Sequence, residues 1–145
     1  MKSQTESKNV VAVRRLYEAR GNPDIVKTVL APDVRWEVVE GFPHSGTYQG
    51  VNEVFDFFTR LFGDFEDWHT EPAEIFEAGD RVIGLGFYSA RAKGTGKPFK
   101  ARFAHVWTVR DGFIVRLQQC ADTVQLEKAL RQELSDESKQ RKVNI

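Results

Sequence analysis

The residues between Ala101 and Val109 constrain the fold of this chain most strongly. Ala101, Phe103, His105, Trp107 and Val109 form one alternate set, and the other set is mixed and includes Arg102. This period of two is typical of a β-strand with two different faces. Asp111-Gly112 follows, and these residue types tolerate the positive φ angles of a type I′ turn. The pattern therefore predicts the first strand and the turn of a β-hairpin.

The return strand of this hairpin is predicted from Phe113 to Ala121. Its alternate positions Phe113, Val115, Leu117, Gln119 and Ala121 are apolar except for one amide. The hairpin should therefore present an apolar wall that carries His105 and Gln119 as its polar groups.

Length and charge favour one domain without a nucleic-acid partner. The chain has 145 residues, with 21 basic and 21 acidic side chains, so its formal net charge is zero. A nucleic-acid-binding protein normally shows a basic excess. We expect a single domain over residues 1–145, with its core at about 9–131 and flexible tails at 1–8 and 135–145.

The sequence gives no sign of a membrane or secretory segment. No apolar run approaches the roughly 20 residues that cross a bilayer, and the start of the chain lacks an apolar signal core. Cys120 is the single cysteine, which fits a reducing compartment. A cytoplasmic location without a membrane partner is the expectation.

The remaining pattern predicts an α+β fold. Helices are expected at about 10–21 and 24–30, and again where apolar residues from Val51 to Phe62 recur at helical spacing. Strands are expected at 34–39, 69–76 and 81–92, the last with Ile83, Leu85 and Phe87 on one face. A curved antiparallel sheet wrapped around the N-terminal helices would form a cone with an interior. Its convex face would pair with a second copy, giving a homodimer.

The order of these elements, with the segment Gly46-Thr47-Tyr48-Gln49-Gly50 and the Phe-rich helix, resembles the nuclear transport factor 2-like superfamily, a cystatin-like roll. Within it, the chain is most similar to the SnoaL-like polyketide cyclase and ketosteroid-isomerase-related group. The resemblance covers roughly residues 10–130. It specifies the fold better than the function, because members include isomerases, cyclases, dehydratases and domains without catalysis.

The resemblance also implies roles for individual residues. Tyr17 and His105 lie where ketosteroid isomerases place two hydrogen-bond donors, which face an aspartate base in those enzymes. Val38 stands at the position matched to the isomerase base, so the steroid-isomerase reaction is not implied. Asp122 resembles instead the aspartate that SnoaL-like cyclases use as their base.

Each polar candidate has a structural alternative. His105 either lines a pocket as a neutral imidazole or is a core histidine satisfied by a neighbour. Asp122 is either a general base or the N-cap of a last helix, since Gln125 follows at capping-box spacing. His44 is either a residue at the rim of the pocket or an exposed loop histidine.

We therefore expect a pocket with His105, Asp122 and Tyr17 as catalytic groups. The expected ligand-binding residues are Trp36, His44, Phe58, Phe87, Phe103, Trp107 and Gln119. The three histidines lack metal-ligand spacing, and the groups named need neither metal nor cofactor. The leading hypothesis is a small, largely apolar carbonyl ligand, with proton abstraction next to the carbonyl. The alternative is a non-catalytic domain that binds a small molecule or dimerises.

Overall fold

The computed structural model describes residues 6–132 of the chain. This part begins with the helices α1 (Lys8–Ala19) and α2 (Pro23–Val29). The Ser7 side chain caps α1, and Asn22 caps α2 ahead of Pro23, as expected for these residue types. The turn between the two helices contains Arg20 with a positive φ of 50°. The predicted tails lie mostly outside the described residues, but Lys8 already belongs to α1.

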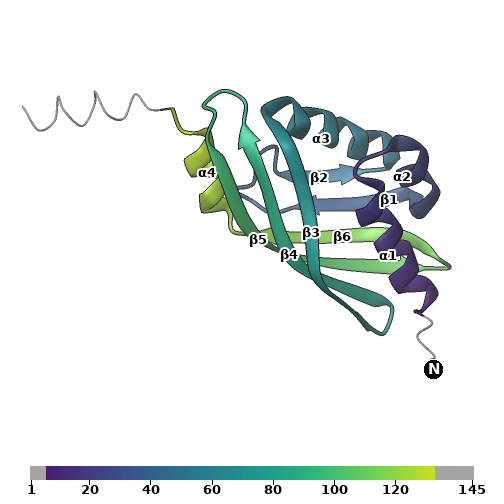
Figure 1. The fold of residues 1–145 in the computed structure, drawn as a ribbon. Helices are drawn as coiled ribbons and strands as arrows, with labels where there is room; N and C mark the ends of the chain where they lie inside the picture. Colours follow the sequence, from purple (N-terminus) through teal and green to yellow (C-terminus); the bar gives the residue numbers. More distant parts are fainter. Residues whose placement is uncertain (1–5, 133–145) are drawn as a thin grey trace, which may run out of the picture.

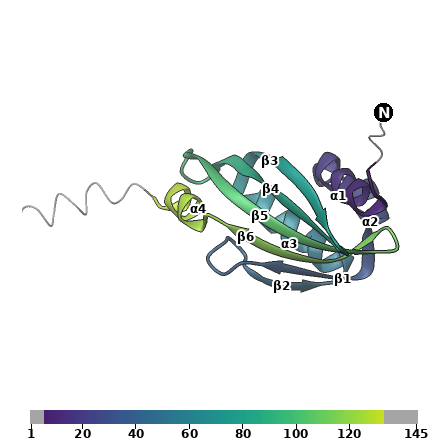
Figure 2. The same cartoon turned by 90° about the horizontal axis from the view of Figure 1, so that it is seen from below.

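The remaining elements are mainly strands, with α3 inserted between β2 and β3. They are β1 (Leu30–Val38), β2 (Gly46–Gln49), α3 (Val51–Asp64), β3 (Phe65–Ala78), β4 (Arg81–Ala92), β5 (Pro98–Arg110), β6 (Phe113–Ala121) and α4 (Thr123–Leu130). Helices α1, α2 and α3 lie on one face of the sheet, and α4 lies at one end of it (Figures 1 and 2).

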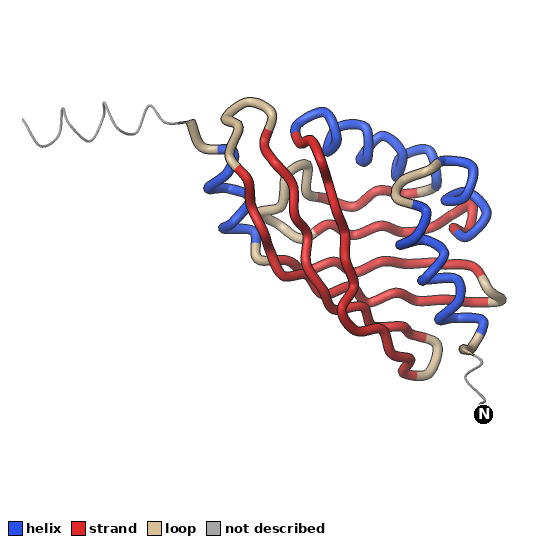
Figure 3. Tube along the Cα trace, in the orientation of Figure 1, coloured by secondary structure: helices blue, strands red, loops and turns tan. Residues whose placement is uncertain are grey.

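The six strands form one sheet in the order β2-β1-β6-β5-β4-β3. Strands β3 to β6 and the β1–β2 pair are antiparallel, but β1 runs parallel to β6. The sheet is therefore mixed, and the prediction of a purely antiparallel sheet is wrong at this one pair. Its strands curve around the helices (Figure 3), and register shifts in β3 at Glu66/His69 and Pro72/Glu74 accompany the bend. The expected α+β fold is confirmed.

The β5–β6 hairpin pairs His105 directly with Gln119, so both side chains occupy the same face as predicted. Asp111 and Gly112 both adopt positive φ, as the turn requires. A register shift between Thr108 and Val109 changes which residues of β6 point inward. Ile114 is fully buried, whereas Phe113 is 46% exposed, contrary to its predicted place on the apolar wall.

Strand β4 shows the predicted alternation, but its inner face is the other one. Val82 and Tyr88 are buried together with Gly84 and Gly86, whereas the set containing Phe87 is only partly buried. In α3 the buried residues are Val54, Phe57 and Leu61, so the inner stripe of this helix is shifted relative to the predicted one. Within residues 6–132, no helix is both long and apolar enough to cross a membrane.

Candidate functional site

A cavity of about 540 Å³ lies between the inner face of the sheet and helices α1 to α3. This volume falls in the range of about 300–1,000 Å³ that is usual for small-molecule sites. Six of the residues predicted for the site line the cavity: Tyr17, Trp36, Phe58, His105, Trp107 and Gln119. The structure therefore brings together side chains from α1, α3, β1, β5 and β6.

Aromatic rings form much of the cavity wall. The Trp36 ring contacts Phe58 at 5.6 Å and Trp107 at 5.5 Å between centroids, both edge to face. On the other side, Phe42 packs against Trp68 at 6.3 Å. Such a wall favours a ligand with a large apolar surface.

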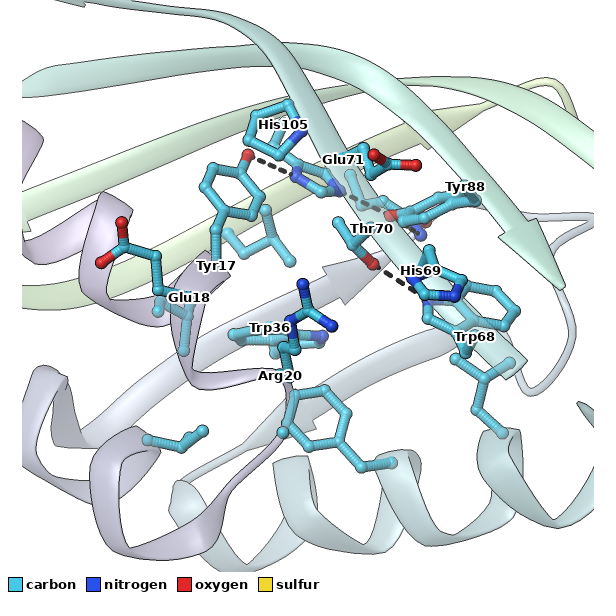
Figure 4. A pocket seen from close by; sticks show the side chains of 18 of the residues that line it. Tyr17, Glu18, Arg20, Trp36, Trp68, His69, Thr70, Glu71, Tyr88 and His105 are labelled. Carbon is cyan, nitrogen blue, oxygen red and sulfur yellow. Dashed lines mark hydrogen bonds between the residues drawn. The ribbon is translucent and has the colours of Figure 1, made fainter. Parts of the chain in front are cut away.

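His105 is buried in the wall of the cavity, with 4% exposure. Its imidazole stacks on Phe103 at 4.0 Å between centroids. Its Nδ1 is 2.8 Å from the Tyr17 hydroxyl, and its Nε2 is 2.5 Å from the Tyr88 hydroxyl (Figure 4). Both ring nitrogens are thus bonded within the protein, so His105 would act on a ligand through a tyrosine.

Each tyrosine hydroxyl also accepts a hydrogen bond from a second partner. Trp107 Nε1 donates to the Tyr17 oxygen at 3.0 Å. Gln119 Nε2 donates to the Tyr88 oxygen at 3.0 Å, and Gln119 Oε1 accepts from the Val39 amide at 3.1 Å. The result is a continuous network that runs from the Trp107 indole to the backbone of Val39.

Burial keeps this network neutral near physiological pH. Desolvation lowers the pKa of His105 to about 3, because the charged imidazolium is disfavoured away from water. Desolvation also raises the pKa of Tyr17, which its hydrogen bond from Trp107 opposes. It likewise raises the pKa of Tyr88 against the bond from Gln119. The cavity therefore offers neutral hydrogen-bonding groups rather than a buried charge.

Gly84 makes room for the Tyr17 hydroxyl above β4. A Cβ atom built at Gly84 would overlap that hydroxyl, and the ring Cζ would be 3.1 Å from it. Tyr17 comes from α1, whereas Gly84 faces His105 across the β4–β5 pair. The absence of a side chain at Gly84 therefore lets a helix residue reach the imidazole on the sheet.

Asp122 lies outside this cavity, which contradicts its predicted place in the pocket. It is exposed and contributes, with Phe87, to a separate shallow depression on the opposite face of the sheet. Its carboxylate does not cap α4 but accepts a bond of 3.3 Å from Gln125 Nε2. A residue on the outer face cannot remove a proton from a ligand held on the inner face, so its assignment as the base is corrected.

Three other predicted binding residues are also placed differently. The Phe87 ring lies on the outer face, with Lys100 Nζ 4.6 Å from its centroid. His44 lies in the exposed loop before β2, where its Nε2 is 2.7 Å from Asp64 Oδ2. Phe103 supports the His105 ring by stacking rather than lining the cavity.

Tyr88 is a site residue that was missing from the sequence-based set. Tyr88 belongs to the alternate set of β4 that begins with Val82. This set also contains Gly84 and Gly86, so its sequence does not resemble that of an apolar inner face. Trp68 and Phe42 were missed as well, because each follows an irregular stretch in which alternation gives no signal. Among residues 6–132 there is no group of three His, Cys, Asp or Glu side chains that could hold a metal ion.

A curved sheet whose helices enclose an aromatic cavity is the arrangement of the nuclear transport factor 2-like class. Residues 13–117 match the family model described as a SnoaL-like domain. The chain belongs to this SnoaL-like family. No curated protein sequence matches it.

Several solved structures are similar to the chain along most of its length. An NTF2-like protein from Burkholderia thailandensis is 35% identical with a TM-score of 0.81, covering 87% of this chain and 99% of that one. An NTF2-like protein of unknown function from Burkholderia pseudomallei is 31% identical with a TM-score of 0.80, covering 86% and 98%. TerC, co-crystallized with polyporic acid, is 26% identical with a TM-score of 0.78, covering 85% and 98%.

Proposed function

We propose that this chain binds a small, largely apolar carbonyl compound in the cavity, with the carbonyl oxygen accepting a hydrogen bond from the Tyr17 hydroxyl. The observation that carries the proposal is the neutral Tyr17 hydroxyl in an aromatic cavity of about 540 Å³. Tyr17 is partly exposed and lines the cavity, so a ligand can reach it. The co-crystal of TerC with polyporic acid supports a small organic molecule as the occupant.

Binding is favoured over proton abstraction by the position of the carboxylates. Asp122 is on the other face, and the carboxylates that line the cavity, Glu18 and Glu71, belong to exposed residues. His105 has a pKa lowered to about 3 by burial, which makes it a weak base. The described residues thus supply a donor for an oxygen atom but no base deep in the cavity.

The test compares two ligands of the same shape, 2-acetylnaphthalene and 2-isopropenylnaphthalene, by ligand-observed NMR titration. Only the first carries an oxygen acceptor. One neutral hydrogen bond corresponds to about a five- to tenfold difference in Kd, in favour of the ketone. Tyr17→Phe should abolish this difference. Tyr48→Phe is the matched control, because its hydroxyl bonds to the His44 carbonyl away from the cavity.

The result that overturns the proposal is equal binding of the two naphthalenes to the natural sequence. A preference for the ketone that survives Tyr17→Phe would overturn it equally. Failure of both compounds to bind at their solubility limits would reject a flat aromatic ketone as ligand and, with it, the proposal as stated.

A second copy of this chain is the partner that we propose for the convex face of the sheet. Ile83, Leu85 and Phe87 on β4 and Val106 on β5 point to this face and remain partly exposed. Association through the same face of two copies would cover them on both chains. Such a dimer would leave the cavity, on the inner face, open to ligand.

A further inference from the structure

We infer that Tyr88 holds His105 in the tautomer that carries its proton on Nδ1, and that Tyr17 is thereby kept as a donor toward the ligand. The inference rests on the proposed function in one respect, since Tyr17 is taken as the group that meets the ligand. It adds a positioning role for Tyr88, and it explains why the ligand atom that meets Tyr17 must be a hydrogen-bond acceptor.

The directions of the hydrogen bonds at the two ends of the network follow from groups that can only donate. The Val39 amide can only donate, so the Gln119 atom facing it must be the oxygen. The Gln119 amide nitrogen then faces Tyr88 and donates to its hydroxyl oxygen. At the other end, the Trp107 indole N–H can only donate, so the Tyr17 oxygen accepts from it.

A neutral imidazole between two hydroxyls leaves two arrangements. In the first, Nδ1–H donates to Tyr17 and the Tyr88 hydroxyl donates to Nε2, so the Tyr17 hydrogen remains available. In the second, Tyr17 donates to Nδ1 and Nε2–H donates to Tyr88, so the Tyr88 hydrogen remains available. The two arrangements have the same number of internal hydrogen bonds and differ in which hydroxyl hydrogen is left over.

Exposure decides between the two arrangements. Tyr88 is 5% exposed, and within residues 6–132 its hydroxyl bonds only to His105 and to the Gln119 donor. A leftover hydrogen there would be buried without an acceptor, which disfavours the second arrangement by about tenfold or more in population. Both tyrosines line the cavity, but Tyr17 is the more exposed of the two, so its hydrogen can be accepted there by water or a ligand oxygen.

The chosen tautomer has a chemical consequence for the ligand. The Tyr17 oxygen accepts from both Trp107 and His105, and two accepted bonds polarise its own O–H toward the ligand. A ketone, aldehyde or ester oxygen fits this donor. A ligand that could only donate would require the proton on His105 to move from Nδ1 to Nε2, and it would leave the Tyr88 hydroxyl hydrogen without an acceptor.

The tautomer can be read without any ligand, by long-range ¹H–¹⁵N correlation of the imidazole ring. His44→Gln combined with His69→Gln leaves His105 as the single histidine in the sequence. The expected spectrum has a protonated, pyrrole-like Nδ1 and an unprotonated, pyridine-like Nε2. The opposite pattern, an averaged pair of shifts, or an imidazolium at pH 7 would overturn the inference.

Tyr88→Phe and Gln119→Leu separate the positioning role from ordinary packing. Tyr88→Phe removes the donor to Nε2, so we expect both tautomers to be populated, and 2-acetylnaphthalene to shift them back toward Nδ1–H. Gln119→Leu deletes a hydrogen bond nearby but keeps the Tyr88 hydroxyl, so the Nδ1–H tautomer should persist. An unchanged tautomer in Tyr88→Phe would refute the role of Tyr88. If the natural sequence has the Nδ1–H tautomer but binds 2-acetylnaphthalene no more tightly than 2-isopropenylnaphthalene, only the proposed ligand is refuted.

Discussion

Replacing Gly84 with alanine should separate Tyr17 from His105 while leaving the rest of the core in place. The new Cβ would occupy the position of the Tyr17 hydroxyl, so the phenol must tilt away from the sheet. That tilt breaks the bond to His105 at 2.8 Å and the bond from Trp107 at 3.0 Å. The buried Trp107 N–H is then left without its acceptor.

The expected cost follows from these two bonds. A buried donor without an acceptor costs about 1–3 kcal/mol, and each lost hydrogen bond contributes about 1 kcal/mol. Alanine in place of glycine within a strand stabilises by about 0.5–1 kcal/mol, because the unfolded chain then has less conformational entropy to lose. The free energy of unfolding should therefore fall by about 2–4 kcal/mol for Gly84→Ala. In a domain of this size, that corresponds to a loss of about 4–16 °C in Tm.

Urea unfolding of four proteins measures whether the loss comes from this one contact. They are the natural sequence, Gly84→Ala, Tyr17→Phe and the double variant. With the hydroxyl already absent, the alanine should cost much less, giving a coupling energy of at least about 1 kcal/mol. Gly63→Ala is the control, because its Cβ would meet open space on α3 and should stabilise by up to about 1 kcal/mol. Additive losses at positions 17 and 84 would refute the reasoning.

Two further predictions concern pH and assembly. Since burial lowers the pKa of His105 from 6.5 to about 3, the unfolded chain binds the proton first as pH falls. The contribution of neutral His105 to stability is therefore full above about pH 6.5 and is lost between there and pH 3, by at most about 1.4 kcal/mol per pH unit. In urea unfolding, the stability of the natural sequence relative to His105→Gln should fall over this range, and a constant difference from pH 7 to pH 4 would contradict the assignment. Val106→Lys on the convex face should convert the proposed dimer to a monomer in analytical ultracentrifugation, and a monomeric natural sequence would refute the dimer.

Local patterns predicted the hairpin and the N-terminal helices because each rests on residues adjacent in sequence. Alternation around His105 and the Asp111-Gly112 turn predict the β5–β6 hairpin, but the turn alone would pair His105 with Gln118, and the register shift between Thr108 and Val109 produces the observed His105–Gln119 pair. The parallel β1–β6 pairing was not accessible, because it joins segments about eighty positions apart and no local pattern encodes strand direction. No sequence pattern indicates the register shift between Thr108 and Val109, and the prediction therefore placed Phe113 on the wrong face.

Asp122 shows why a residue type and a family resemblance together do not locate a base. The carboxylate follows β6 directly, and its position at the sheet end is compatible with either face until the twist of the last residues is known. In the structure, its backbone N–H bonds to the Arg102 carbonyl, and its side chain lies on the outer face beside Phe87. The chemistry of the cavity then depends on tyrosines, whose phenol lengths let them reach His105 from α1 and β4.

Strand β4 carries the signal that could have revealed this arrangement. An inner set reading Val82, Gly84, Gly86, Tyr88 is poor in apolar volume, and glycine within a strand often marks a close approach by another group. Both glycines do so here: Gly84 faces the Tyr17 hydroxyl, and Gly86 faces the backbone of the β3 bulge at Glu71. Two inward glycines followed by a tyrosine therefore indicate a strand whose inner face is occupied by a neighbour's polar group rather than by its own side chains. On that interpretation the apolar set containing Phe87 is left for the outer face, as the structure shows.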